Sequence, residues 1–122
     1  MDKPTILIVD DERSARHGMR MLLERDYRII SAENSSSALE KLESNKVDIM
    51  LTDVRMPGMD GIELMELAQK KYNDLKCIIL TAYGDVDLAV QAMKKGAVDF
   101  MTKPINLDKL EILLKRLLQS QK

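Results

Sequence analysis

The sequence predicts an α/β fold in which one doubly wound parallel sheet of five strands carries helices on both faces. Five short apolar runs alternate with five longer segments of helical period. Strict alternation of this kind indicates parallel strands joined by right-handed crossovers. Three of the runs are apolar almost throughout, which is typical of strands that are covered on both faces.

The apolar runs are the predicted strands. Their ranges are Thr5–Val9, Arg28–Ala32, Val47–Thr52, Lys76–Thr81 and Val98–Met101. The first, third and fourth runs belong at the centre of the sheet. The second and fifth contain Arg28 and Asp99, and charge at an edge strand prevents unwanted pairing. These assignments favour the order 2-1-3-4-5, a flavodoxin-like (βα)5 sheet.

A helix is expected after each strand. The predicted ranges are Ser14–Arg25, Ser35–Ser44, Gly61–Lys71, Val86–Lys95 and Leu107–Gln119. Asn106 is suited to cap the last helix. The apolar stripe of that helix predicts ordinary core packing, and its members are Leu107, Leu110, Leu114, Leu117 and Leu118.

The fourth predicted helix has two apolar faces. The stripe expected to face the sheet consists of Val86, Ala89, Val90 and Met93. Leu88 and Ala92 form a second patch away from it. That patch is either scattered surface, which is normal, or a partner-binding surface that a rotation of the helix exposes.

Composition restricts the class of protein. The 122 residues fit a single domain over 1–122. With 19 basic and 20 acidic residues and no basic block, no nucleic-acid surface is expected. No run approaches a membrane span, and the first residues lack the apolar core of a signal peptide. The single cysteine, Cys77, excludes an internal disulfide, so a cytoplasmic protein with a buried, inert thiol is expected.

Acidic residues follow two strands that the predicted order makes neighbours. Asp10 and Asp11 end the first strand, and Asp53 ends the third. Like charges that converge in a crevice raise one another's pKa, and Mg²⁺ would relieve that repulsion. A carboxylate can also act as a nucleophile once a metal activates it. The cluster is therefore a candidate phosphoryl-transfer site.

Two further polar residues are expected at the same edge of the sheet. Thr81 ends the fourth strand and Lys103 follows the fifth. A lysine ammonium and a threonine hydroxyl can both donate to phosphoryl oxygens. Each is a weak signal alone, but their joint placement supports the site. His17, the only histidine, is expected to be solvated and to carry no phosphoryl group.

Other phosphate-handling proteins fit less well. A flavin-mononucleotide binder would need a phosphate cradle after the first strand, where three acidic residues stand instead. The five glycines are scattered and form no P-loop. A hydrolase of the aspartyl-phosphate type would carry its nucleophile on the first strand, with a second Asp two residues on, where this chain has Glu12.

Four separated motifs together resemble the receiver domain of two-component response regulators, over the whole chain. They are Ile6–Glu12, Asp53–Gly61, Thr81–Tyr83 and Lys103–Pro104. Residues 81–104 look most like receivers of sigma-54-dependent activators of the nitrogen-regulation type. In such proteins an ATPase and a DNA-binding domain follow, so we expect an excised receiver, with a stand-alone receiver as the alternative.

The resemblance implies roles for the acidic residues. Asp53 matches the phosphoacceptor, and Mg²⁺ is the implied cofactor, with Mn²⁺ as a substitute. Asp11 matches a direct metal ligand, Asp10 a ligand through water, and the backbone carbonyl of Arg55 a further protein ligand. The implied function is a phosphorylation switch that catalyses only its own phosphorylation and dephosphorylation.

The resemblance also implies the switching residues. Thr81 matches the switch hydroxyl and Lys103 the lysine that pairs with the phosphoryl group, with a cis bond to Pro104. The switch aromatic, often tyrosine, falls at Phe100, which lacks a phenolic hydroxyl. Signalling through ring packing is therefore expected, without signalling through a phenolic hydrogen bond.

Neighbours and partners follow from the same likeness. Arg55 and Tyr83 are expected to tune hydrolysis of the phosphoryl group. The implied partners are a sensor histidine kinase and an output domain or protein, which binds the face of the fourth helix, fifth strand and fifth helix. A homodimer on phosphorylation is a further expectation, because Ile112 points away from the core stripe. A phosphate-independent interaction module and a phosphate-releasing enzyme stay open as alternatives.

Overall fold

The computed structural model describes residues 3–82 and 84–119 and contains the expected parallel sheet. The strands are β1 Thr5–Val9, β2 Arg28–Ala32, β3 Ile49–Asp53, β4 Lys76–Thr81 and β5 Asp99–Thr102. They lie in the order β2-β1-β3-β4-β5 and all pairs are parallel. The chain reverses its direction of growth between β1 and β3, and ligands bind sheets of this kind at that point.

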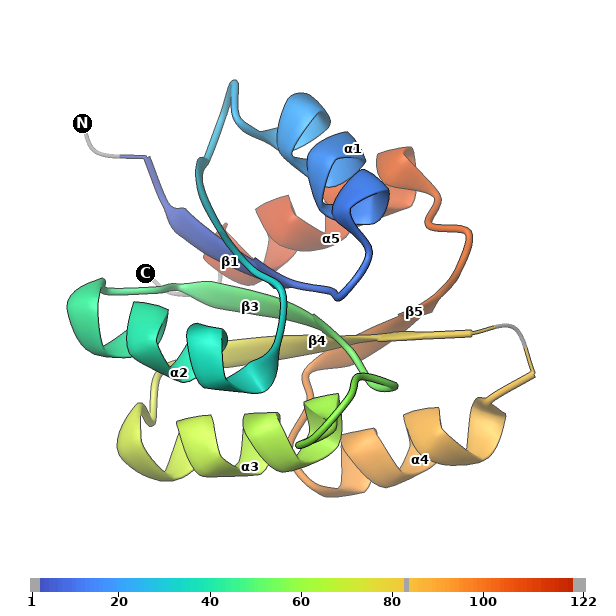
Figure 1. The fold of residues 1–122 in the computed structure, drawn as a ribbon. Helices are drawn as coiled ribbons and strands as arrows, with labels where there is room; N and C mark the ends of the chain where they lie inside the picture. The colour runs from blue at the N-terminus through green and yellow to red at the C-terminus, as the bar shows by residue number, and fades with distance from the viewer. Residues whose placement is uncertain (1–2, 83, 120–122) are drawn as a thin grey trace.

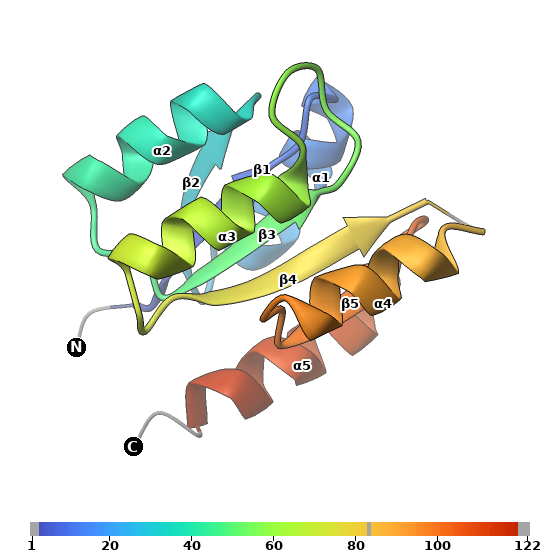
Figure 2. The same cartoon turned by 90° about the horizontal axis from the view of Figure 1, so that it is seen from below.

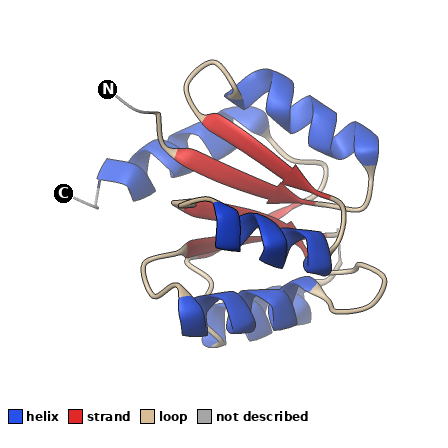
Figure 3. Cartoon of the chain, turned by 60° about the vertical axis from the view of Figure 1, so that its left-hand side comes forward, coloured by secondary structure: helices blue, strands red, loops and turns tan. Residues whose placement is uncertain are grey.

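The helices cover the two faces of the sheet. Their bounds are α1 Arg13–Leu23, α2 Ser35–Ser44, α3 Gly61–Lys71, α4 Val86–Lys94 and α5 Leu107–Gln119. Helices α1 and α5 lie on one face, and α2, α3 and α4 lie on the other (Figures 1 and 2). Figure 3 shows the strands enclosed between these layers. None of the helices in the described part of the chain has the length and hydropathy needed to cross a bilayer.

Alternate strand residues build two separate cores. Ile6 and Ile8 of β1 pack with the α1 and α5 side, whereas Leu7 and Val9 pack with the α2, α3 and α4 side. Burial of each such side chain contributes roughly 1.5–3 kcal/mol. Cys77 lies fully buried in the second of these cores, and burial raises the pKa of its thiol to about 12. The expected buried position of Cys77 is confirmed.

Several element boundaries differ from the expected ones by one or two residues. Strand β3 runs over Ile49–Asp53, so Asp53 is the last residue of the strand. Helix α1 ends at Leu23, because the amides of Asp26 and Tyr27 both donate to the Leu23 carbonyl and turn the chain. The shift at β3 matters most, since it holds Asp53 in the hydrogen-bonded sheet.

The orientation of α4 is the main correction. Ala89 and Ala92 are fully buried and Leu88 packs against the core. Of the expected inner stripe, Ala89 is buried as predicted, whereas Val86, Val90 and Met93 are exposed, at 65 %, 46 % and 41 %. The helix is thus rotated by about 100°, one residue position, from the expected orientation. Small alanine side chains let the helix backbone approach the sheet, and the branched valines are left outside.

Helix α5 is packed as expected except at its first residue. Asn106 caps it, accepting a hydrogen bond from the Lys109 amide at 3.1 Å. Leu110 and Leu114 are buried, and the leucines of the last turn pack against the same core. Leu107, the first residue of the helix, is 36 % exposed.

Candidate functional site

Strand register brings the expected site residues to one edge of the sheet. Val9 of β1 pairs with Thr52 of β3, so the residues that follow them, Asp10 and Asp53, are neighbours. Thr81 pairs with Thr102, and the amide of Lys103 donates to the Thr81 carbonyl at 2.7 Å. Four strands therefore deliver their carboxyl ends to one place.

The expected acidic cluster is present there. Carboxylate oxygens of Asp10, Asp11 and Asp53 all lie within 4.8 Å of one another. Asp10 is fully buried and Asp11 is exposed, so the cluster extends from the core to the solvent. Hard oxygen ligands of this kind are those that Mg²⁺ binds in proteins, and the donor set fits that ion.

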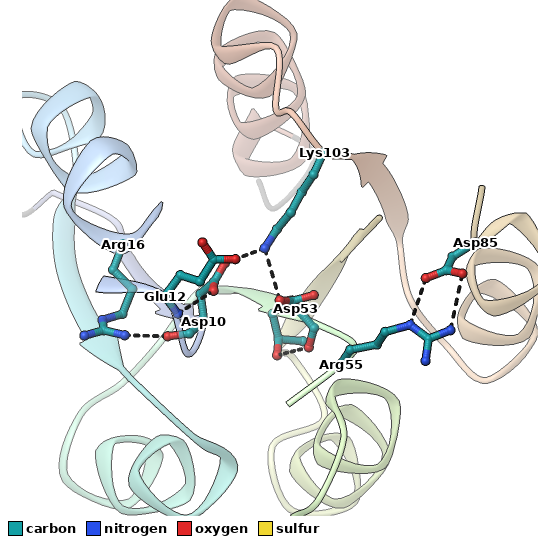
Figure 4. A network of polar contacts seen from close by, with 8 residues as sticks. Asp10, Glu12, Arg16, Asp53, Arg55, Asp85 and Lys103 are labelled. Atoms are coloured by element: carbon teal, nitrogen blue, oxygen red, sulfur yellow. Dashed lines mark hydrogen bonds and ion pairs between the residues drawn. The ribbon is translucent and has the colours of Figure 1, made fainter. Parts of the chain in front are cut away.

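Lys103 joins two of these carboxylates (Figure 4). Its ammonium Nζ donates to Asp10 Oδ2 at 2.8 Å and to Asp53 Oδ2 at 3.0 Å. The side chains of Lys103 and Asp53 are 24 % and 13 % exposed, so water screens these contacts only in part. A single cation therefore holds the carboxyl ends of β1 and β3 together from the end of β5.

Burial and charge perturb both partners of this bridge. Burial raises the pKa of Asp53, and the charge of Asp10 adds to the rise, although the Lys103 hydrogen bond opposes it. Burial acts to lower the pKa of Lys103, but hydrogen bonds to Asp10 and Asp53 outweigh it and raise that pKa. Lys103 therefore stays charged. The Asp53 carboxylate beside it is a partly buried anion, which is unfavourable unless a cation lies next to it.

The backbone around Asp10 is fixed by contacts that the sequence did not reveal. The amide of Glu12 donates to Asp10 Oδ1 at 2.9 Å. Arg16 Nη1 donates to the Asp10 carbonyl at 2.6 Å. Arg16 sits in the first turns of α1, and its place shortly after the acidic pair was the one signal available in the sequence.

The backbone around Asp53 depends on a close approach by α3. The Gly61 amide donates to the Val54 carbonyl at 2.9 Å, and a Cβ at Gly61 would collide with the carbonyl oxygen of Asp53. Thr52 Oγ1 donates to that same oxygen at 3.0 Å. Glycine at position 61 is therefore required for the loop to close beside Asp53.

Arg55 does not point into the cluster. Its guanidinium makes a two-pronged contact with Asp85, with Nε–Oδ2 at 3.0 Å and Nη2–Oδ1 at 3.3 Å. Figure 4 shows the side chain extended away from Asp53 toward the start of α4. Asp85 was not among the expected site residues, because a separation of 30 residues gives no pattern in one sequence.

The remaining expected residues have mixed positions. Thr81 is buried at the end of β4, beside the strand that carries Asp53. Phe100 is 38 % exposed on β5. The Lys103–Pro104 bond is cis. Tyr83 lies outside the described residues, and its expected role stays a prediction.

Known proteins match this chain over nearly its full length. The response regulator receiver domain family matches residues 6–115. The DNA-binding transcriptional regulator NtrC of Proteus hauseri is 36 % identical over 117 residues, which is 95 % of this chain and 25 % of that protein. The transcriptional regulatory protein ZraR of Klebsiella oxytoca is 41 % identical over 110 residues, 89 % of this chain and 25 % of its own.

A solved structure agrees with the sequence match. The receiver domain protein of Clostridium thermocellum superposes with a TM-score of 0.91 at 30 % identity, covering 97 % of this chain and 96 % of the other. The chain spans about a quarter of the length of the curated relatives it matches, and those relatives confirm the expected likeness to nitrogen-regulation-type receivers. With this fold, this acidic edge and this match, the chain belongs to the response regulator receiver domain family.

Proposed function

We propose that this receiver is a phosphorylation switch in which Asp53 accepts a phosphoryl group. The observation that carries the proposal is the Lys103 bridge to Asp10 and Asp53 within the acidic cluster. A charged amine already lies 3.0 Å from the expected nucleophile. Phosphoryl transfer needs little covalent chemistry from the protein and depends on positioning and charge stabilisation.

The donor set supports Mg²⁺ as the cofactor. Asp10, Asp11 and Asp53 would hold it with the backbone carbonyl of Arg55, and Mn²⁺ has similar ligand preferences. When bound, the ion supplies positive charge that neutralises the transferring group. Arg16 holds the backbone of Asp10 and so keeps the buried carboxylate in place for this role.

The transfer itself is a displacement at phosphorus. An Asp53 carboxylate oxygen forms the new P–O bond while the P–N bond of a donor phosphohistidine breaks, and the imidazole leaves with its electron pair. The donor is a sensor histidine kinase or a small phosphodonor; with acetyl phosphate, a P–O bond breaks instead and acetate leaves with the electron pair. Lys103 then exchanges its contact with the Asp53 carboxylate for a phosphoryl oxygen, a charge-assisted hydrogen bond.

The switch follows from repacking near Thr81. Its hydroxyl turns toward the phosphoryl group, and the ring of Phe100, now 38 % exposed, moves into the space left behind. Phosphorylation thereby shifts the equilibrium between two states of the domain. The size of the shift is set by how much more favourably the phosphoryl group interacts with one state than with the other. The domain performs no chemistry other than its own phosphorylation and dephosphorylation.

The output surface is the face built by α4, β5 and α5. Its support is a group of exposed apolar side chains: Val86, Val90, Met93, Phe100 and Ile112. Apolar side chains gathered on one face mark interaction sites. We place an output domain or a second copy of the chain there, with transcription as the controlled process in a cytoplasmic setting.

Intact mass after incubation with acetyl phosphate and Mg²⁺ tests the proposal. We expect one phosphoryl adduct on the wild type, and none on Asp53→Ala or in the presence of EDTA. A wild type that binds Mg²⁺, folds normally and yields neither an adduct nor released phosphate would contradict the switch. That result would favour the phosphate-independent interaction module, whereas rapid phosphate release would favour an enzyme.

A further inference from the structure

Helix α4 begins without the cap that its sequence provides. Asp85 stands at the N-cap position, where its carbonyl accepts the amide of Ala89 at 3.2 Å. Aspartate is among the best capping residues, yet its side chain makes no capping hydrogen bond. The corresponding residues of α2, α3 and α5, Asn34, Asp60 and Asn106, all cap their helices.

The carboxylate of Asp85 is bound by Arg55 instead. Both guanidinium contacts lie at hydrogen-bond distance, and the side chains of Arg55 and Asp85 are 71 % and 23 % exposed. An ion pair this exposed contributes little to stability. It does decide where the Asp85 carboxylate points, which is away from the first amides of α4.

Arg55 also belongs to the acceptor loop. It lies two residues after Asp53, and its side chain crosses from that loop to the start of α4 (Figure 4). A phosphoryl group on Asp53 would bring about −1.5 to −2 charges and three acceptor oxygens. A guanidinium binds a phosphoryl group through two parallel hydrogen bonds, as it does a carboxylate. The phosphoryl group carries more negative charge than the Asp85 carboxylate and so competes with it for Arg55.

We propose that Arg55 exchanges partners on phosphorylation, and that this exchange frees Asp85 to cap α4. This inference rests on the proposed phosphorylation of Asp53. In the unphosphorylated state Arg55 holds Asp85 off the helix. In the phosphorylated state Arg55 binds the phosphoryl group, and the Asp85 carboxylate accepts from the amides of Asp87 and Leu88. Asp85 is thus a positioning residue that acts on α4 under the control of Arg55.

Helix α4 is suited to respond to such a cap. It has two fully buried residues, Ala89 and Ala92, so little packing fixes its first turn. A new cap would extend and order that turn. Val86, 65 % exposed at the first helical position, would then be presented in a defined orientation to the output partner.

Amide hydrogen–deuterium exchange on the complete chain tests whether Arg55 changes its partner from Asp85 to the phosphoryl group. Protection at Asp87 and Leu88 is measured with and without acetyl phosphate and Mg²⁺. In the wild type we expect the protection factors of these two amides to rise about fivefold on phosphorylation. This is the factor that corresponds to the usual stabilisation by an N-cap. Arg55→Gln should show that rise before any phosphodonor is added, because Asp85 is already free to cap.

Two further variants provide the controls. Asp85→Ala should accept a phosphoryl group to the same stoichiometry but show no rise in protection. Glu66→Gln removes the exposed Lys95–Glu66 ion pair at the other end of α4 and should respond as the wild type does. Equal thermal midpoints for Asp85→Ala and the wild type would separate this readout from a general loss of structure.

The outcomes are distinct from those that test phosphorylation itself. If Arg55→Gln without phosphodonor shows only wild-type protection, the exchange of partners is wrong, whether or not Asp53 accepts a phosphoryl group. A phosphorylated wild type with no rise at Asp87 and Leu88 overturns it equally. If no adduct forms on the wild type while Arg55→Gln shows the rise, the proposed function fails and the competition between Arg55 and the cap stands.

Discussion

Helices α3 and α4 lie side by side on one face of the sheet (Figure 2) but are held very differently. Helix α3 buries five residues and starts with a full capping box between Asp60 and Glu63. Helix α4 buries two, Ala89 and Ala92, and its N-cap side chain makes no cap. Helix α3 follows β3, which ends at Asp53, and α4 follows β4, which ends at Thr81.

The difference separates two tasks within one layer. The helix next to Asp53 fixes the loop after β3, and the proposed phosphoryl transfer would require accurate positioning of this kind. The helix next to Thr81 has few buried contacts, and such elements open and shift at low free-energy cost. Under the proposed function, a rigid loop at Asp53 would be combined with a more weakly held α4, as a switch between two populated states needs.

The largest test of this contrast concerns buried side chains. Leu64 of α3 is fully buried, and Leu64→Ala should lower the free energy of unfolding by about 3 kcal/mol through lost burial and a cavity. Val90 of α4 is 46 % exposed, and Val90→Ala should change it by less than about 0.5 kcal/mol. Urea unfolding followed by circular dichroism measures both, and equal losses would contradict the contrast.

A second test concerns the approach of α3 to the backbone of Asp53. Gly61→Ala should destabilise by about 2 kcal/mol, because its Cβ collides with the carbonyl of Asp53. At Gly18 in α1 an added Cβ would meet no atom within 4 Å, so Gly18→Ala should stabilise by roughly 0.5–1 kcal/mol. Thermal unfolding of the two variants should therefore shift in opposite directions, and a neutral Gly61→Ala would disprove the close approach.

A third test compares the two N-caps. Asp60 accepts from the amides of Ile62 and Glu63, so Asp60→Ala should cost about 1 kcal/mol. Asp85 makes no such bond, so Asp85→Ala should cost less than about 0.5 kcal/mol in the unphosphorylated protein. Both are measured by urea unfolding without phosphodonor. A cost of about 1 kcal/mol or more at Asp85, the size of an ordinary cap, would show that α4 is already capped.

The smallest expected effect lies between the two helices. Lys95 at the end of α4 contacts Glu66 of α3 at 3.5 Å, with the side chains 48 % and 42 % exposed. Glu66→Gln should change stability by less than about 0.5 kcal/mol and only at low salt. A larger change that persists at high salt would mean that α3 and α4 are coupled more firmly than their packing indicates.

Most of the fold could be predicted from the sequence, because strand and helix periods differ and because parallel strands covered on both faces are apolar throughout. Arg28 and Asp99 identified the edge strands correctly. The neighbouring positions of Asp10, Asp53 and Lys103 then followed from strand order alone. The strand topology was sufficient to predict this part of the site, without any knowledge of side-chain conformation.

The orientation of α4 could not be predicted in the same way. Hydrophobicity favoured a face with Val86, Ala89 and Val90. The structure buries Ala89 together with Ala92, which was expected outside, and leaves both valines exposed. How closely a helix approaches a sheet depends on side-chain size at the contact, and a periodic pattern does not contain that distance. Amphipathic periods identify a helix reliably, but they fix its rotation only when one apolar face dominates.

The Arg55–Asp85 ion pair could not be predicted from the sequence, for a different reason. Charged residues make up 32 % of the chain, so any one pairing among them is improbable from sequence alone. The pair forms only if the loop after β3 and the turn before α4 both place their side chains correctly. Only the three-dimensional structure reveals that Asp85, a good N-cap by residue type, is engaged elsewhere.

Synthesis of this chain reaches Asp10 early and Lys103 late. The contact between them spans 93 residues of sequence, and the contact of Lys103 with Asp53 spans 50. A nascent chain that has released the first three strands from the ribosome therefore carries both carboxylates without the amine that neutralises them. The cluster that we propose as the phosphoryl acceptor is complete only when β5 joins the sheet and brings Lys103 to both carboxylates.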